Sequence, residues 1–138
     1  MSERMEENKV SDYCTEMLYY LPVASEFFSS GLELYAEGMN CKLSWCFEEN
    51  NKEKKTTLLF NTVAGSQYCL PIFVVDIYNA FEQLVEVKNS SWVKRFSQIN
   101  PKDIKYFDLK HYVIFFGDDG LYEFLATNVE IITEDVNF

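Results

Sequence analysis

The sequence predicts an α+β fold, with one antiparallel sheet of about five strands and helices packed on one face of it. Apolar and polar residues alternate before residue 63 and again after residue 110, as they do in half-buried strands. Between these regions, apolar residues recur at the spacing of a helix. The 138 residues contain no long Pro-, Gly- or Ser-rich linker, so we expect a flexible leader over residues 1–10 and a single domain over residues 11–138.

The start of the domain predicts a helix followed by a short helical turn. Ser11 can cap the helix, because a serine hydroxyl accepts hydrogen bonds from the first free backbone N–H groups. Pro22 limits the length of this helix, and the second turn is expected before Gly31. The apolar side of the helix carries Cys14, Met17, Leu18 and Leu21.

Alternation with a period of two predicts a first hairpin. Residues 32–36 and 39–47 both alternate, but the parity of the apolar set changes at Gly38, which indicates a tight turn or a bulge. A polar loop is expected over residues 48–55. Residues 56–62 then return as a strand that pairs with the preceding one.

The central region predicts two helices. Pro71 is well placed as the first residue of a helix over residues 72–87, because its missing N–H is no loss there. The apolar face of that helix would consist of Val74, Ile77, Tyr78, Phe81, Leu84 and Val85. Ser91 can cap a shorter helix that carries Trp92 and Phe96 and ends before Pro101.

The C-terminal part predicts a second hairpin. Residues 112–116 and 121–126 flank the turn Asp118-Asp119-Gly120, and residues 128–133 either extend the hairpin or add a strand. Its large apolar residues share one parity and should pack on the helices. Glu123 has the opposite parity, so we expect it to be exposed together with Asp118 and Asp119.

The formal charge of −10 and the pI near 4.5 disfavour nucleic acid and anionic membranes as partners and favour a basic protein surface. Six acidic residues and no basic one follow Lys110. The candidate partner-binding residues are therefore Asp118, Asp119, Glu123, Glu130 and Glu134.

The inventory of reactive side chains argues against an enzyme. His111 is the only histidine, so any His-based acid, base or zinc ligand must involve it, and its place at the start of an apolar strand predicts a packed or edge-strand residue. Cys41 and Cys46 would point to opposite faces of a strand and cannot chelate one zinc ion. We therefore expect no catalytic residue, no metal site and no cofactor.

Three C-terminal segments resemble part of some bacterial immunity proteins of contact-dependent growth inhibition. They are residues 89–94 (NSSWVK), residues 112–122 (YVIFFGDDGLY) and residues 128–131 (NVEI), so the resemblance covers the C-terminal third to half of the chain. It implies a non-enzymatic binding protein that neutralises a cognate toxin domain by masking it. It defines no binding residues.

The alternative is a type III secretion chaperone-like dimer that binds an effector, because such chaperones are also small, acidic and α+β. The helix expected over residues 72–87 would then mediate self-association, and the oligomeric state stays open. Acidic residues precede the first apolar run, and no run approaches the ~20 apolar residues that span a bilayer. Both alternatives therefore imply a cytoplasmic protein.

Overall fold

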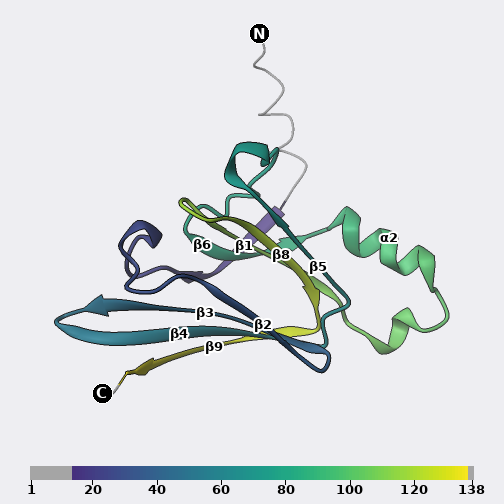
Figure 1. Cartoon of the computed structure of the whole chain (residues 1–138). Coiled ribbons are helices and arrows are strands. Elements are labelled where there is room, and N and C mark those ends of the chain that lie inside the picture. The colour runs from purple at the N-terminus through teal and green to yellow at the C-terminus, as the bar shows by residue number, and fades with distance from the viewer. Residues whose placement is uncertain (1–13, 137–138) are drawn as a thin grey trace, which may run out of the picture.

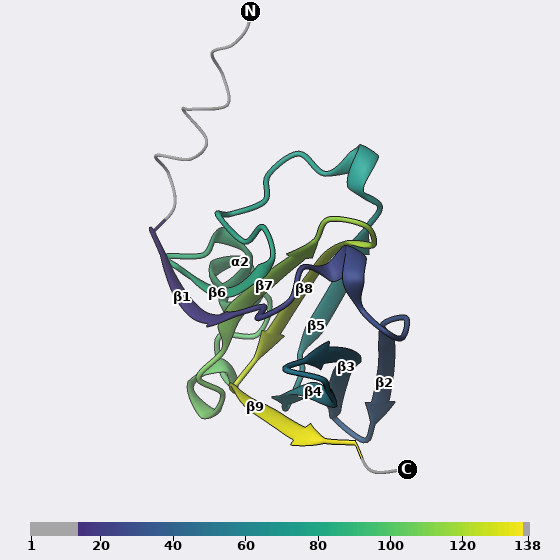
Figure 2. The same cartoon turned by 90° about the vertical axis from the view of Figure 1, so that its left-hand side faces the viewer.

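A computed structural model describes residues 14–136, and the expected leader over residues 1–10 and the expected cap at Ser11 lie outside these described residues. The described chain forms two antiparallel sheets stacked as layers (Figures 1 and 2). The five-stranded sheet has the order β1 (Cys14–Tyr20), β6 (Gln83–Lys88), β7 (Lys110–Phe116), β8 (Gly120–Ala126) and β5 (Gly65–Cys69). The four-stranded sheet has the order β2 (Glu33–Glu37), β3 (Asn40–Glu49), β4 (Lys52–Asn61) and β9 (Asn128–Asp135).

The predicted α+β fold with helices packed on one sheet is wrong, because the described residues are mostly β-strand. They contain one α-helix, α2 (Ser91–Ile99), and short 3₁₀ turns η1 (Ser25–Phe27), η2 (Pro71–Phe73) and η3 (Ile104–Tyr106). The partner of the five-stranded sheet is a second sheet rather than a layer of helices. No helix in the described part of the chain has the length and apolar character needed to cross a membrane.

The first predicted helix is instead strand β1, which pairs antiparallel with β6. A register shift between Met17 and Tyr19 interrupts the ladder, and Leu18 and Tyr19 both pack against the core between the sheets. Such a bulge directs two neighbouring side chains to one face and breaks the alternation of a regular strand. The apolar residues of β1 are therefore spaced as they would be on one face of a helix, although they lie in a strand.

The helix predicted over residues 72–87 is also absent, and with it the element that favoured self-association of a chaperone-like dimer. Tyr78, Asn79 and Glu82 have positive φ angles of 55°, 61° and 57°, which no right-handed helix contains. The end of the segment is β6, in which Leu84 and Val85 are both buried, on opposite faces of the sheet. Burial of both faces removes the alternation by which a strand is predicted.

Both predicted hairpins are confirmed. Gly38, with φ 63°, makes the turn between β2 and β3, and Asp119 lies in the turn between β7 and β8. The loop predicted over residues 48–55 is shorter than expected, because β3 and β4 pair out to Glu49 and Lys52. Residues 128–133 add strand β9, which leaves the five-stranded sheet at Thr127 and pairs with β4 in the other sheet.

The main core lies between the sheets and is rich in aromatic rings. Trp45 and Phe60 come from the four-stranded sheet, and Phe116 and Phe124 from the other. The rings of Phe60 and Phe124 stack with 4.1 Å between centroids, and those of Trp45 and Phe116 meet edge to face at 5.3 Å. The shared parity predicted for the apolar residues of β7 and β8 is therefore confirmed.

A second, smaller core covers the opposite face of the five-stranded sheet. Ala80 and Tyr78 of the segment before β6 pack there against Val85 and Val113, and α2 lies beside them on the side away from the four-stranded sheet (Figure 1). A Cβ atom at Gly65 would lie 3.2 Å from Cζ of Phe96, so a ring of α2 rests directly on the backbone of β5. The five-stranded sheet is thus buried on both faces.

Gly120 should tolerate no side chain. Its φ is +150°, and an added Cβ would lie 2.5 Å from the carbonyl oxygen of Cys69. We expect Gly120→Ala to lower the free energy of unfolding by about 2–4 kcal/mol in urea titrations. Gly31→Ala is the control, since nothing lies within 4 Å of the Cβ added there; equal stability of the two variants would contradict the expectation.

Candidate functional site

The site is built around His111, whose side chain lies on the outer face of the five-stranded sheet. His111 stands in β7, and Glu123 stands on the same face of the neighbouring strand β8, diagonally across from it. His111 Nε2 lies 2.8 Å from Glu123 Oε1, and the two residues are only 3% and 6% exposed. His111 is therefore packed, as predicted.

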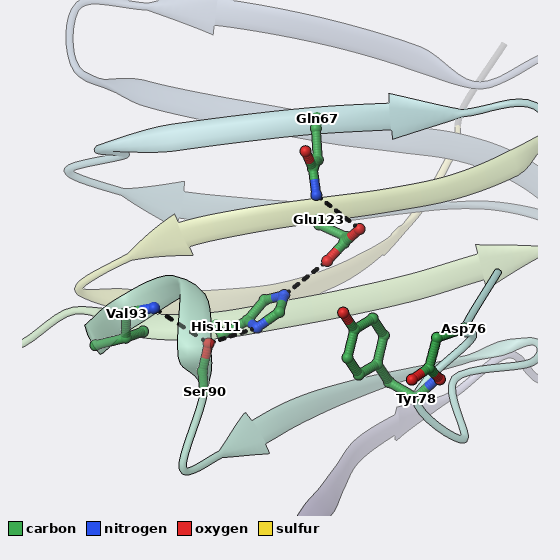
Figure 3. A network of polar contacts seen from close by, with 7 residues as sticks. All are labelled: Gln67, Asp76, Tyr78, Ser90, Val93, His111 and Glu123. Carbon is green, nitrogen blue, oxygen red and sulfur yellow. Dashed lines mark hydrogen bonds and ion pairs between the residues drawn. The ribbon is translucent and has the colours of Figure 1, made fainter. Parts of the chain in front are cut away.

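Ser90 connects this pair to α2. Its hydroxyl lies 2.9 Å from His111 Nδ1 and also accepts a hydrogen bond from the backbone N–H of Val93, which makes it the N-cap of the helix (Figure 3). His111 Nε2–H donates to the Glu123 carboxylate, and the Ser90 hydroxyl forms the hydrogen bond to Nδ1.

Gln67 of β5 completes the network, because its Nε2 donates to Glu123 Oε2 at 3.0 Å. The rings of Tyr78 and Trp92 meet the imidazole edge to face, with centroids 5.4 and 5.2 Å away. Figure 3 shows the hydroxyl end of Tyr78 pointing toward the pair of His111 and Glu123. Polar side chains of three strands thus join α2 and the Tyr78 segment to the sheet.

Serine, histidine and glutamate are the residue types of a hydrolytic triad, but this arrangement has the features of a structural network. Ser90 is 5% exposed, and its oxygen already accepts the N–H of Val93. Each group is satisfied by its neighbours, as buried polar groups need to be. Within residues 14–136, no group of three or more His, Cys, Asp and Glu side chains is placed to hold a metal ion.

The five predicted partner-binding residues do not form one surface. Asp118 is exposed and Asp119 is half-buried at the tip of the β7–β8 hairpin, whereas Glu130 and Glu134 are exposed on β9 in the other sheet. The predicted exposure of Glu123 is wrong. Its parity was assigned correctly, but the Tyr78 segment and α2 cover the face on which it lies.

The hairpin tip is fixed by two tyrosines. The Tyr122 hydroxyl donates to Asp119 Oδ1 at 2.7 Å, and the Tyr68 hydroxyl donates to the backbone carbonyl of Asp119. Burial raises the pKa of Tyr122, and the hydrogen bond to Asp119 adds to the effect. Burial also raises the pKa of Tyr112 on β7, to about 12, and the charges of Glu86 and Asp108 make a smaller contribution.

Glu82 joins the hairpin tip to the turn η1. Its Oε1 accepts the backbone N–H of Ser25 at 2.7 Å, and its Oε2 accepts both the Ser25 hydroxyl at 2.5 Å and the N–H of Gly117 at 2.8 Å. Glu82 thus holds η1 and the hairpin tip together, and η2 lies at the same end of the molecule (Figures 1 and 2).

That end exposes a set of large apolar side chains that the sequence analysis missed. Ile72 and Val75 are 82% and 81% exposed, and Asp118 lines a hollow of about 590 Å³ together with Tyr20 and Phe81. We call this surface the apolar end; it consists of Tyr20, Phe27, Leu70, Ile72, Phe73, Val75 and Phe81. One signal could have indicated it: residues 70–75 are apolar without interruption, which exceeds a single face of a helix.

A test of the network compares two adjacent serines. Ser90→Ala removes the helix cap and the hydrogen-bond partner of His111, so we expect the free energy of unfolding to fall by about 1–2 kcal/mol. Ser91→Ala changes an exposed residue and should stay within about 0.5 kcal/mol of the wild type. The measurement is urea unfolding followed by tryptophan fluorescence. A larger loss at Ser91 would assign the cap to Ser91, as the sequence analysis expected.

A second test uses alkaline pH. The pKa values of Tyr112 and Tyr122 are higher in the folded state than the ordinary value of 10.0. The protonated phenols therefore stabilise the folded state at a pH below 10, and this contribution to the free energy of unfolding is lost as the pH rises toward 12. We expect the urea midpoint to fall over that range, and to fall less in Tyr112→Phe. Tyr106→Phe changes an exposed tyrosine and should follow the wild type. Identical pH profiles of the two variants would refute the assignment to Tyr112.

Comparison with known proteins adds no residue roles to this geometry. No protein-family model, no curated protein sequence and no solved structure matches the chain. The resemblance to immunity proteins of contact-dependent growth inhibition stays a prediction, and the function is argued below from the residues themselves.

Proposed function

We propose that the chain is a non-enzymatic protein-binding protein of the immunity type, which neutralises a cognate bacterial toxin domain in the cytosol by covering it. The observation that carries this proposal is the apolar end. Seven large apolar side chains are exposed at the end of β1, in η1 and η2, and in the connections that flank η2 and precede β6. Exposed apolar side chains gathered at one end of a molecule are expected at a protein–protein interface rather than on a surface that only meets water.

The charges around the apolar end favour a basic partner. Asp118 and Glu26 line the hollow beside Phe81, and Asp76 lies on the other side of the hairpin tip, beside Phe73. With a net charge of −10, the whole chain would attract a basic partner before contact and accelerate association. A toxin that cleaves nucleic acid is expected to be basic at its substrate cleft, so this surface could cover that cleft.

The buried network of Ser90, His111 and Glu123 supports the non-enzymatic part of the proposal. The side chains of Ser90 and His111 are engaged in holding α2 on the sheet. The rings of Trp92 and Tyr78 pack against the imidazole, and the pocket beside it has a volume of only about 130 Å³. The polar chemistry of these residues is accounted for by packing.

The proposal is tested with the secreted toxin domain whose gene would neighbour that of this chain. Co-expression should restore growth of cells that produce the toxin domain, and the purified proteins should form a one-to-one complex. The association rate should fall about tenfold or more between roughly 20 mM and 500 mM NaCl. Failure to restore growth would reject the immunity role, and a rate independent of salt would reject the electrostatic part.

Variants of exposed residues locate the interface. Ile72→Ser combined with Val75→Ser should weaken partner binding about tenfold or more without loss of folding, since both side chains are already in water. Ile99→Ser is the matched control, because Ile99 is an exposed aliphatic residue at the end of α2. Binding would be measured by surface plasmon resonance.

Charge variants separate the two acidic surfaces. Asp118→Asn should slow association, whereas Glu134→Gln on β9 should leave it unchanged, because β9 belongs to the other sheet. The opposite pattern would place the interface on β9, where Glu130 and Glu134 are the remaining predicted contact residues.

A further inference from the structure

We infer that a cleft beside the apolar end receives an arginine side chain of the partner protein; this inference rests on the proposed function. The cleft has a volume of about 520 Å³ and lies between the segment that carries Phe73 and Tyr78 and the outer face of the five-stranded sheet. We call it the Glu123 cleft; the residues that matter to its chemistry are Gln67, Tyr68, Phe73, Asp76, Tyr78 and Glu123. Its volume is within the range of specific ligand sites.

The charge of the cleft selects a cation. Asp76 and Glu123 are its two charged lining residues, and no lysine or arginine lines it. Arg95 of α2 lines a separate, smaller pocket of about 130 Å³ that shares Gln67, Tyr78 and Glu123 with the cleft. A cationic group that enters the cleft therefore meets two carboxylates.

The burial of Glu123 strengthens this selection. The Glu123 carboxylate is only 6% exposed, and its oxygens lie within hydrogen-bond distance of His111 Nε2 and Gln67 Nε2. A buried charge of this kind is costly unless a counter-charge is present. Glu123 Oε1 accepts from His111 and Oε2 from Gln67, and each oxygen has a second lone pair that can accept an incoming donor. The partner's guanidinium would add a favourable charge interaction with this carboxylate.

Asp76 can take part without giving up its structural role. Its Oδ1 accepts the backbone N–H of Tyr78 at 2.9 Å, which leaves acceptor positions on the other oxygen. In Figure 3 the ring of Tyr78 lies between Asp76 and the imidazole of His111. Asp76 thus lies beside the ring of Tyr78, whereas Glu123 lies near the hydroxyl end of that side chain.

The aromatic walls favour arginine over lysine. Tyr68 and Phe73 line the cleft and are partly exposed, and a planar guanidinium can stack on such rings while its N–H groups reach carboxylates in two directions. An ammonium group has a compact, strongly hydrated charge and no plane to stack. The alkyl part of an arginine side chain would contact Val75 and Leu121, which also line the cleft.

The inference can be tested on the isolated chain. N-acetyl-arginine amide is titrated into the isotopically labelled protein, and the backbone amide signals of Gln67, Phe73 and Tyr78 are followed by NMR. We expect saturable shifts in the millimolar range with capped arginine, weaker ones with capped lysine, and none with the neutral isostere N-acetyl-citrulline amide. The absence of saturable shifts, or equal shifts with citrulline, would overturn the inference.

Asp76→Asn is the main variant, because asparagine keeps an acceptor for the N–H of Tyr78 and removes only the charge. It should weaken binding of capped arginine about fivefold or more. Asp135→Asn removes the same charge on β9, outside the cleft, and should leave binding unchanged. Glu123→Gln is a second variant for the same binding measurement, provided that a cooperative thermal unfolding transition shows that it folds.

Measurements of toxin binding and of growth restoration distinguish a failure of this inference from a failure of the proposed function. If Ile72→Ser with Val75→Ser abolishes toxin binding while Asp76→Asn and capped arginine have no effect on it, the proposed function stands and the arginine site is rejected. If the chain binds capped arginine in the cleft but restores no growth, the site stands and the immunity role is rejected.

Discussion

The rest of the structure depends on the burial of both faces of the five-stranded sheet. One face packs on the four-stranded sheet through an aromatic core, and the other is covered by the segment before β6 and by α2. The strands of the four-stranded sheet are joined to one another by backbone hydrogen bonds. The segment before β6 and the nine-residue helix α2 have no such ladder to hold them on the sheet. They are fixed instead by individual polar side chains, chiefly Glu82, Ser90 and His111.

The covering segment has an unfavourable backbone. Tyr78, Asn79 and Glu82 adopt positive φ angles, which non-glycine residues rarely do without compensating contacts. Those contacts are visible: Asp76 accepts the N–H of Tyr78, and the Glu82 carboxylate binds both η1 and the hairpin tip. The segment that leaves Ile72 and Val75 in water is thus attached to the sheet at its C-terminal side.

This attachment links the fold to the proposed binding role. Exposed apolar residues on a free loop would lose conformational entropy on binding, whereas residues next to a fixed backbone lose less. The same segment forms one wall of the Glu123 cleft, and Tyr68 ties that cleft to the hairpin tip through Asp119. Apolar contact, surface charge and a buried carboxylate are therefore brought to one end of a small acidic protein.

The sequence by itself determined two kinds of element: strands that bury only one face, and a helix whose start is marked by a capping residue. Alternation located β2, β3, β7 and β8 and gave the correct parity of Glu123. Ser91, predicted as the cap, located the start of α2 to within one residue, since the N-cap is Ser90. Only the tertiary structure decided that β1 and β6 are strands, because a bulge and two-sided burial removed their alternation. It also decided that Glu123 is buried beside His111 and that Ile72 is exposed. Parity states which side of a strand a residue occupies, but whether that side meets water depends on which distant segment packs over it.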